Sequence, residues 1–293
     1  MHYMSKLSKS VIKIPFVLFI TMVISLISSC ILFYIQDFLF QGHPNAKPFQ
    51  FLKIWSRMLT VVLFFIMIWF CRRVEKRSIR SYGLEQTANA NQLWLGGFFL
   101  GVSSMLLLVC INLFFLDSNV QLKPLNVKFY VDLILQLFIV FTIAILEEWF
   151  FRGYILQTLA TDFGIKSSVI ISSLFFASTH FIRPVSHWSL LIPEFFGLFL
   201  IGIVLANSWV YTKTLYLSIG IHAGWVYIVK LDKYFANHFD LNLQKAFGGE
   251  KLLKSVYAWI LIFLFLFFLK RIVIALNGTL TISHFLQKAK PSR

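Results

Sequence analysis

Long apolar runs separated by short polar and basic segments make up most of this chain. A helix needs about 20 apolar residues to cross a hydrocarbon core about 30 Å thick. Runs of suitable length predict spans at 14–36, 55–71, 93–116, 128–147, 167–182, 190–211, 214–230 and 252–275. The pattern therefore predicts an all-α polytopic membrane protein with about eight transmembrane helices.

Composition agrees with a chain surrounded by lipid. Hydrophobic residues make up 58% of the 293 positions, and only 13% are charged, which is too few for the surface of a soluble domain. The net charge of +15 comes from short clusters between apolar runs, with no basic face or recognition motif. We therefore expect contact with membrane lipid headgroups and no nucleic-acid binding.

We expect one membrane domain over residues 1–293. Linkers are short, and only 231–251 is long enough for a small extramembrane element. The three cysteines, Cys30, Cys71 and Cys110, show no CxxC spacing, so neither a disulfide framework nor a thiolate metal site is indicated.

The basic residues predict how the chain lies in the membrane. With the N-terminus inside, 16 of the 27 Lys and Arg residues fall on inner segments and 11 on outer segments. The largest cluster, in 72–80, lies on the inner side, whereas 231–251 argues for the reverse. The bias predicts cytoplasmic N- and C-termini.

Ionisable residues inside the spans are the candidates for chemistry, because each is costly in lipid. Glu147, Glu148 and Arg152 lie near the expected inner end of the fourth span. Glu148 and Arg152 are four residues apart, share a helix face and can form an ion pair. Glu147 points about 100° away and cannot share that partner easily, which suits a general base. Alternatively, all three residues cap the span at the interface.

Two histidines lie in later spans. His180 shares a helix face with Phe176, and His222 lies between Gly220 and Gly224, a spacing that allows another helix to approach closely. Each histidine could instead be a structural residue. Two carboxylates and two histidines are nonetheless the groups that activation of water requires. The zinc, aspartyl and serine protease motifs HExxH, GxGD and GxSG are missing.

Three motifs in order resemble the CPBP family of CAAX prenyl protease type II and bacteriocin-processing membrane proteins, also called the abortive-infection family. They are EExxxR at 147–152, FxxxH at 176–180 and the HAGW segment at His222. The resemblance covers residues 128–230 and identifies them as a CPBP-like catalytic core. It implies an intramembrane endopeptidase in which Glu147 and His180 activate water. It also counts Glu148 and His222 among the catalytic residues, with His222 stabilising the oxyanion and Glu148, paired with Arg152, holding the site in position. Arg152 and Phe176 give structural support.

The family motif HxxxN has Val226 at its Asn position here. Asn207 is the one nearby intramembrane amide that could replace the missing donor. Some family members were first described as metalloproteases, but no short-spaced ligand pair supports zinc or another divalent metal. We expect no certain cofactor.

The compact single-domain form favours a multi-pass protein of a bacterial plasma membrane over one of the endoplasmic reticulum. Its substrate would be a membrane-associated protein or a peptide precursor. Two alternatives stay open. A non-catalytic immunity or scaffold protein could retain the family fold, which Val226 favours. A transporter could use Glu and His as a proton relay, although no inverted repeat is visible.

Overall fold

The computed structural model describes residues 2–40, 51–115, 127–181, 191–235 and 255–288. These residues are helical or lie in short connections, and no strand occurs among them. The elements are α1 (His2–Phe40), α2 (Phe51–Arg73), the 3-10 helix η1 (Ile79–Tyr82), α3 (Ala90–Phe115), α4 (Val127–Glu148), the π-helix η2 (Trp149–Leu156), α5 (Gln157–Thr179), α6 (Leu191–Thr212), α7 (Tyr216–Phe235) and α9 (Val256–Lys288).

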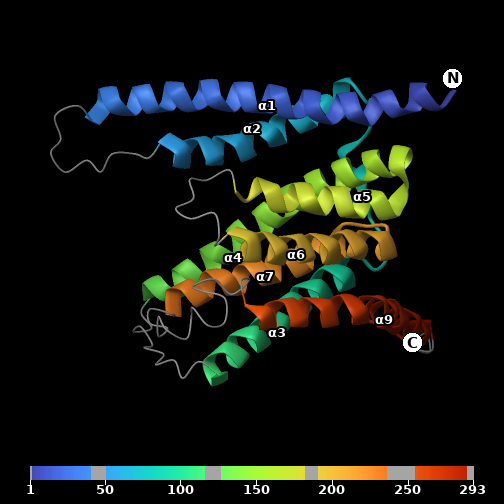
Figure 1. The fold of residues 1–293 in the computed structure, drawn as a ribbon. Helices are drawn as coiled ribbons and strands as arrows, with labels where there is room; N and C mark the ends of the chain where they lie inside the picture. The colour runs from blue at the N-terminus through green and yellow to red at the C-terminus, as the bar shows by residue number, and fades with distance from the viewer. Residues whose placement is uncertain (1, 41–50, 116–126, 182–190, 236–254, 289–293) are drawn as a thin grey trace.

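The helices form a bundle with α4, α6 and α7 at its centre (Figure 1). The α1–α2 pair packs on one side and reaches α5, while α3 and α9 cover the opposite side. The most extensive contact joins α3 to α7. The candidate core therefore lies between an N-terminal pair of helices and the α3–α9 layer.

The chain reverses direction inside the helical stretch from α4 to α5. Gly164 has φ +75° and ψ 163°, a conformation that L side chains rarely adopt, and no other atom crowds its Cα. The two legs then pack together, since the rings of Phe151 and Phe176 lie 5.1 Å apart at 88°. Residues 129–179 thus form a helical hairpin, as the two spans predicted at 128–147 and 167–182 require.

α4 ends at Glu148, one residue beyond the predicted end of the fourth span, but the chain stays helical there. The helix continues past Glu148 as η2, and every residue from Trp149 to Leu156 is buried. This segment can be buried because the charge of Arg152 is paired with that of Glu148, and because the remaining η2 side chains are largely aromatic or aliphatic. The Glu148–Arg152 pair is consequently buried inside the bundle.

Large apolar side chains face outward along several helices. Phe19 on α1, Phe138 on α4 and Phe267 on α9 are 65%, 69% and 71% exposed. Such surfaces are stable in hydrocarbon and unstable in water. The protein is therefore an all-α, multi-pass membrane protein, as predicted.

Four stretches of the described chain are long and apolar enough to cross a membrane: Ala90–Ile111, Phe129–Thr179, Leu191–Thr212 and Val256–Leu276. This is fewer than the eight predicted spans, partly because two of those spans share the hairpin Phe129–Thr179. A further stretch, Lys13–Ser28, is apolar but shorter. Most of the 231–251 linker lies outside the described residues.

Candidate active site

Four ionisable side chains converge where α4 passes into η2. Glu147 and Glu148 end α4, Arg152 lies one turn further along, and His222 reaches them from α7. Three of the four come from one helix, whereas His222 is 74 residues away in sequence from Glu148. We call these four residues the Glu–His cluster.

Glu148 is the centre of the cluster. Its Oε1 accepts a 2.6 Å hydrogen bond from Arg152 Nη1 and lies 2.8 Å from His222 Nδ1. The side chains of Glu148 and Arg152 are 0% and 1% exposed. Since an ionised carboxylate only accepts hydrogen bonds, Nδ1 of His222 carries the proton of this bond. Nε2 then lies on the opposite side of the ring, away from Glu148.

Glu147 lies on that opposite side. Its Oε2 is 3.8 Å from His222 Nε2, and its side chain is 26% exposed, in contrast with that of Glu148. Oε2 of both glutamates is buried without a hydrogen-bond partner in the described structure. Two carboxylates face one guanidinium, so one further proton, on Glu147 or His222, makes the cluster neutral. This arrangement can accept and release a proton.

Arg152 is held by contacts on two other helices. Its Nη2 donates a 3.2 Å hydrogen bond to the carbonyl of Gly202 on α6. Its guanidinium carbon lies 4.5 Å from the centre of the Phe176 ring on α5, a cation–π distance. The guanidinium thereby fixes Glu148, and Glu148 in turn fixes the His222 ring.

Phe176 and His180 lie beside the cluster. The Phe176 ring is buried and makes edge contacts with both imidazoles, at 4.7 Å from His180 and 5.9 Å from His222. His180 is exposed at the C-terminal end of α5, where its Nδ1 lies 2.9 Å from the Phe176 carbonyl oxygen. Within the described chain, no hydrogen bond or ion pair joins His180 to either glutamate. His180 is therefore at the edge of the cluster.

Close packing of α3 against α7 places His222. A Cβ at Gly224 would lie 2.5 Å from the Phe98 carbonyl oxygen, and one at Gly101 would lie 2.5 Å from the Ile221 carbonyl oxygen. Gly97 and Gly220 meet the opposite backbone in the same way. Small residues on both helices permit this approach, as the Gly220–Gly224 spacing predicts.

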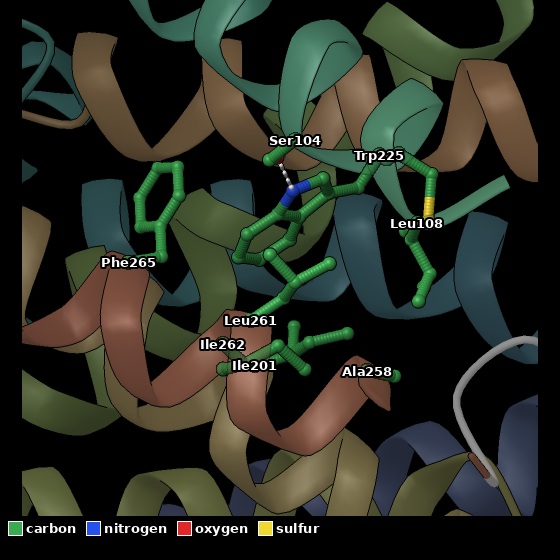
Figure 2. Close-up of a pocket in the computed structure, with 9 residues that line it drawn as sticks. Ser104, Leu108, Ile201, Trp225, Ala258, Leu261, Ile262 and Phe265 are labelled. Carbon is green, nitrogen blue, oxygen red and sulfur yellow. Dashed lines mark hydrogen bonds between the residues drawn. The ribbon is translucent and has the colours of Figure 1, made fainter. Parts of the chain in front are cut away.

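A side-chain bond and a small apolar cavity adjoin the same helix pair. Trp225 Nε1 donates a 2.8 Å hydrogen bond to Ser104 Oγ on α3, beside the cavity in Figure 2. The cavity is closed by apolar side chains of α6 and α9, including Ile201 and Phe265. It contains no acid or base, so we assign no chemistry to it.

The structure also places three residues that the sequence singled out. Among the described residues Arg152 forms its ion pair with Glu148 and not with Glu147, as predicted, and Glu147 faces His222 instead. Asn207 donates to the Ile203 carbonyl of its own helix, and Val226 packs against the apolar core. Neither residue is placed as an oxyanion donor by a contact among the described residues.

Sequence reasoning did not identify the π-helix η2 or the Gly202 carbonyl as parts of the site. The wide turn of η2 follows directly after the two glutamates, and π-helical segments occur frequently at functional sites. A helical periodicity of 3.6 residues does not reveal such a turn. Gly202 itself was visible in the sequence as a glycine within an apolar helix, which favours close approach of another helix. The structure shows that approach, because a Cβ at Gly202 would lie 2.8 Å from Ser173 Cβ.

Comparison with known proteins agrees with this geometry. The family model described as Type II CAAX prenyl endopeptidase Rce1-like matches residues 129–228, which contain the whole Glu–His cluster together with Phe176 and His180. No curated protein and no solved structure matches the chain. Residues 129–228 are therefore similar to type II CAAX prenyl endopeptidases, in agreement with the resemblance to the CPBP family that the motifs indicate.

Proposed function

We propose that this protein is an intramembrane endopeptidase that hydrolyses a peptide bond in a membrane-associated protein or peptide precursor. The observation that carries the proposal is the partly exposed Glu147 carboxylate facing Nε2 of an otherwise buried, oriented His222. The family match supports peptidase chemistry in general, and the geometry supports these residues for it.

In the proposed reaction, Glu147 takes a proton from a water molecule as the water oxygen attacks the scissile carbonyl carbon. The carbonyl oxygen becomes negatively charged, and a protonated His222 stabilises it through Nε2. Collapse of this intermediate breaks the C–N bond, and Glu147 passes the proton that it took from water to the leaving amine. Glu148 and Arg152 hold His222 throughout and touch neither product.

His180 has a second role in the proposal. The family resemblance pairs it with Glu147 in activating water, and its exposure at the end of α5 leaves its ring accessible to substrate or solvent. The Phe176 ring, which contacts both imidazoles, sets its position relative to His222. We propose that His180 assists at the mouth of the site, while His222 acts inside it.

No step is assigned to a metal. Among the described residues, no group of three or more His, Cys, Asp or Glu side chains is arranged to hold an ion. His222 Nδ1 is already engaged by Glu148, and Glu148 Oε1 also accepts from Arg152. The proposed steps therefore use the side chains alone.

A non-catalytic immunity or scaffold protein is the second candidate. The apolar Val226 at the motif's Asn position favours it, because loss of one oxyanion donor lowers rates about 10²–10³-fold where that donor is used. In that case, the Glu–His cluster would only join α4, η2 and α7. The two candidates differ in what removal of the Glu147 charge does.

We further propose a bacterial plasma membrane with both termini in the cytoplasm. The basic segments predicted as inner support this orientation. The start of α1 and the end of α9 lie at the same end of the bundle in Figure 1. The 72–80 segment and the turn from α6 to α7 are joined there, because Leu215 N donates to Gly83 O at 2.8 Å. Membrane lipid and a membrane-associated substrate are the expected partners.

Comparison of protein N-termini in native-host membranes tests the function. Cells would carry wild type, Glu147→Gln or the exposed-site control Glu85→Gln at matched levels. We expect new N-termini that occur with wild type and Glu85→Gln and disappear with Glu147→Gln. Identical profiles for all three under several growth conditions would favour the scaffold candidate.

A further inference from the structure

A cationic surface lies at the end of the bundle where α2 passes into η1. Its members are exposed basic side chains, which we call the cationic rim: Arg72, Arg73, Lys76, Arg77, Arg80 and Lys213. The first five come from one short stretch, and Lys213 comes from the turn between α6 and α7.

The fold brings these two segments together. Leu215 N donates a 2.8 Å hydrogen bond to Gly83 O, and the Tyr216 hydroxyl donates to Leu84 O at 3.2 Å. Lys76 and Lys213 have φ values of +51° and +57°, and they are the non-glycine residues with positive φ in the described chain. Such conformations cost energy for a side chain with a Cβ. Both strained lysines therefore belong to this one surface.

Carboxylates do not neutralise the rim. Glu75 lies within the stretch, but its two oxygens are occupied by Lys13 Nζ and the Tyr82 hydroxyl, each at 2.7 Å. Glu85 is exposed nearby and is a single charge against six. In the described structure, no rim residue forms a salt bridge with a carboxylate. The rim thus has a strong excess of positive charge.

The rim borders an apolar, lipid-facing surface. Trp69, one helical turn before Arg73, is 52% exposed, and Val74 is 48% exposed. Trp side chains gather at membrane–water interfaces, where the indole contacts both acyl chains and headgroups. With Trp69 as such an anchor, the neighbouring cations would lie at the depth of the phosphate groups.

We propose that the cationic rim binds the headgroup of an anionic phospholipid, with Trp69 against its acyl chains. The argument is charge complementarity at headgroup depth, and it does not depend on the proposed proteolysis. Each Lys or Arg near an anionic bilayer strengthens attraction about fivefold at physiological ionic strength. Removal of two rim charges should then weaken headgroup binding roughly 30-fold.

Native mass spectrometry of the full-length protein from mixed phosphatidylglycerol and phosphatidylcholine micelles tests the proposal. The rim variant is Arg73→Gln with Lys76→Gln, neither of which contacts Tyr82 in the described structure. The matched control is Lys270→Gln with Arg271→Gln, an equal loss of charge on exposed residues of α9. Thermal unfolding in neutral detergent without added lipid provides a baseline for each variant.

We expect wild type and the α9 control to retain phosphatidylglycerol, and the rim variant to lose most of it. Phosphatidylglycerol should raise the unfolding temperature of wild type, and added salt should reduce that rise. Equal retention by the rim variant and wild type would overturn the proposal and favour an acidic peptide as the ligand. Equal losses in both double variants would also overturn it, because net charge alone would then explain retention.

Discussion

Two glutamates in this protein each accept hydrogen bonds from a cation and a second donor, but in different surroundings. Glu148 is fully buried between Arg152 and His222 inside the bundle. Glu75 lies at the end of α2, between Lys13 of α1 and the Tyr82 hydroxyl of η1. Lys13 is 35% exposed, whereas Arg152 is 1% exposed.

The ion pairs of Glu148 and Glu75 have similar hydrogen bonds but different roles in the molecule. A buried ion pair is costly to assemble, and replacement by apolar side chains is often neutral or stabilising. The Glu148–Arg152 pair is therefore poorly explained by stability alone and better explained by its orientation of His222 opposite Glu147. The Glu75 pair, whose Lys13 side chain is 35% exposed, joins the N-terminal helices to η1, which borders η2 through Tyr82.

Removal of the buried cation Arg152 should have the largest effect on stability. Arg152→Met leaves Glu148 buried with only His222 as partner, and we expect a loss of about 3–5 kcal/mol in the free energy of unfolding. Unfolding by denaturant in bicelles measures it. The double variant Glu148→Gln with Arg152→Met removes both charges and should be more stable than the single variant. A double variant as unstable as the single one would contradict this account of the pair.

The next largest effect on stability should come from disturbing the packing of α3 against α7, which brings His222 to the cluster. Gly224→Ala places a methyl group against the Phe98 carbonyl, and we expect a loss of about 1–3 kcal/mol in the free energy of unfolding. Gly96→Ala is the matched control on α3, because its methyl group meets only the flexible end of Leu276. The same bicelle titration should show a small effect for the control. Equal effects for the two variants would argue against backbone contact between α3 and α7.

The ion pair between Glu75 and Lys13 should respond to pH. Burial by itself raises the pKa of Glu75, but hydrogen bonds from Lys13 and Tyr82 outweigh it and hold the pKa below 4.5, its ordinary value. Because the folded-state pKa is lowered, the stabilisation is fully present above pH 4.5 and is lost as pH falls through the folded-state value.

Wild type should therefore exceed Glu75→Gln by about 1 kcal/mol in the free energy of unfolding at neutral pH. Titrations from pH 7 to pH 3 should show this difference shrinking toward zero. A difference that stays constant over that range would mean that the Glu75 charge does not stabilise the fold.

The smallest expected effect on stability comes from loss of the hydrogen bond between Trp225 and Ser104 beside the cavity. Trp225→Phe removes the indole donor and should cost about 1 kcal/mol in the free energy of unfolding, because Ser104 keeps its bond to the Gly101 carbonyl. Ser104→Ala should cost more, since it leaves the indole N–H buried and unpaired. The reverse order in bicelle titrations would contradict the assigned bond.

The sequence predicted much of the fold and the composition of the cluster. Apolar runs predicted a helical membrane protein, the i,i+4 spacing predicted the Glu148–Arg152 pair, and the Gly220–Gly224 spacing predicted close helix packing. Each of these signals is local, since it depends on residues that are near one another along the chain.

The site's geometry required contacts that no local pattern specifies. The contact of His222 with both glutamates depends on how α3 packs against α7 and how α7 lies against α4. The burial of Glu148 and Arg152 depends on η2 continuing the helix, and a span length near 20 residues predicted an end there instead.

The most direct test of the central claim measures folding and cleavage on the same Glu147→Gln samples. The claim is that Glu147 is placed for chemistry and not for stability, since its Oε2 is buried without a hydrogen-bond partner in the described structure. We predict that the free energy of unfolding of Glu147→Gln equals or exceeds that of wild type. The new protein N-termini that occur with wild type should be absent with this variant. Unchanged cleavage, or a clear loss of stability, would contradict the claim and make the cluster a structural one.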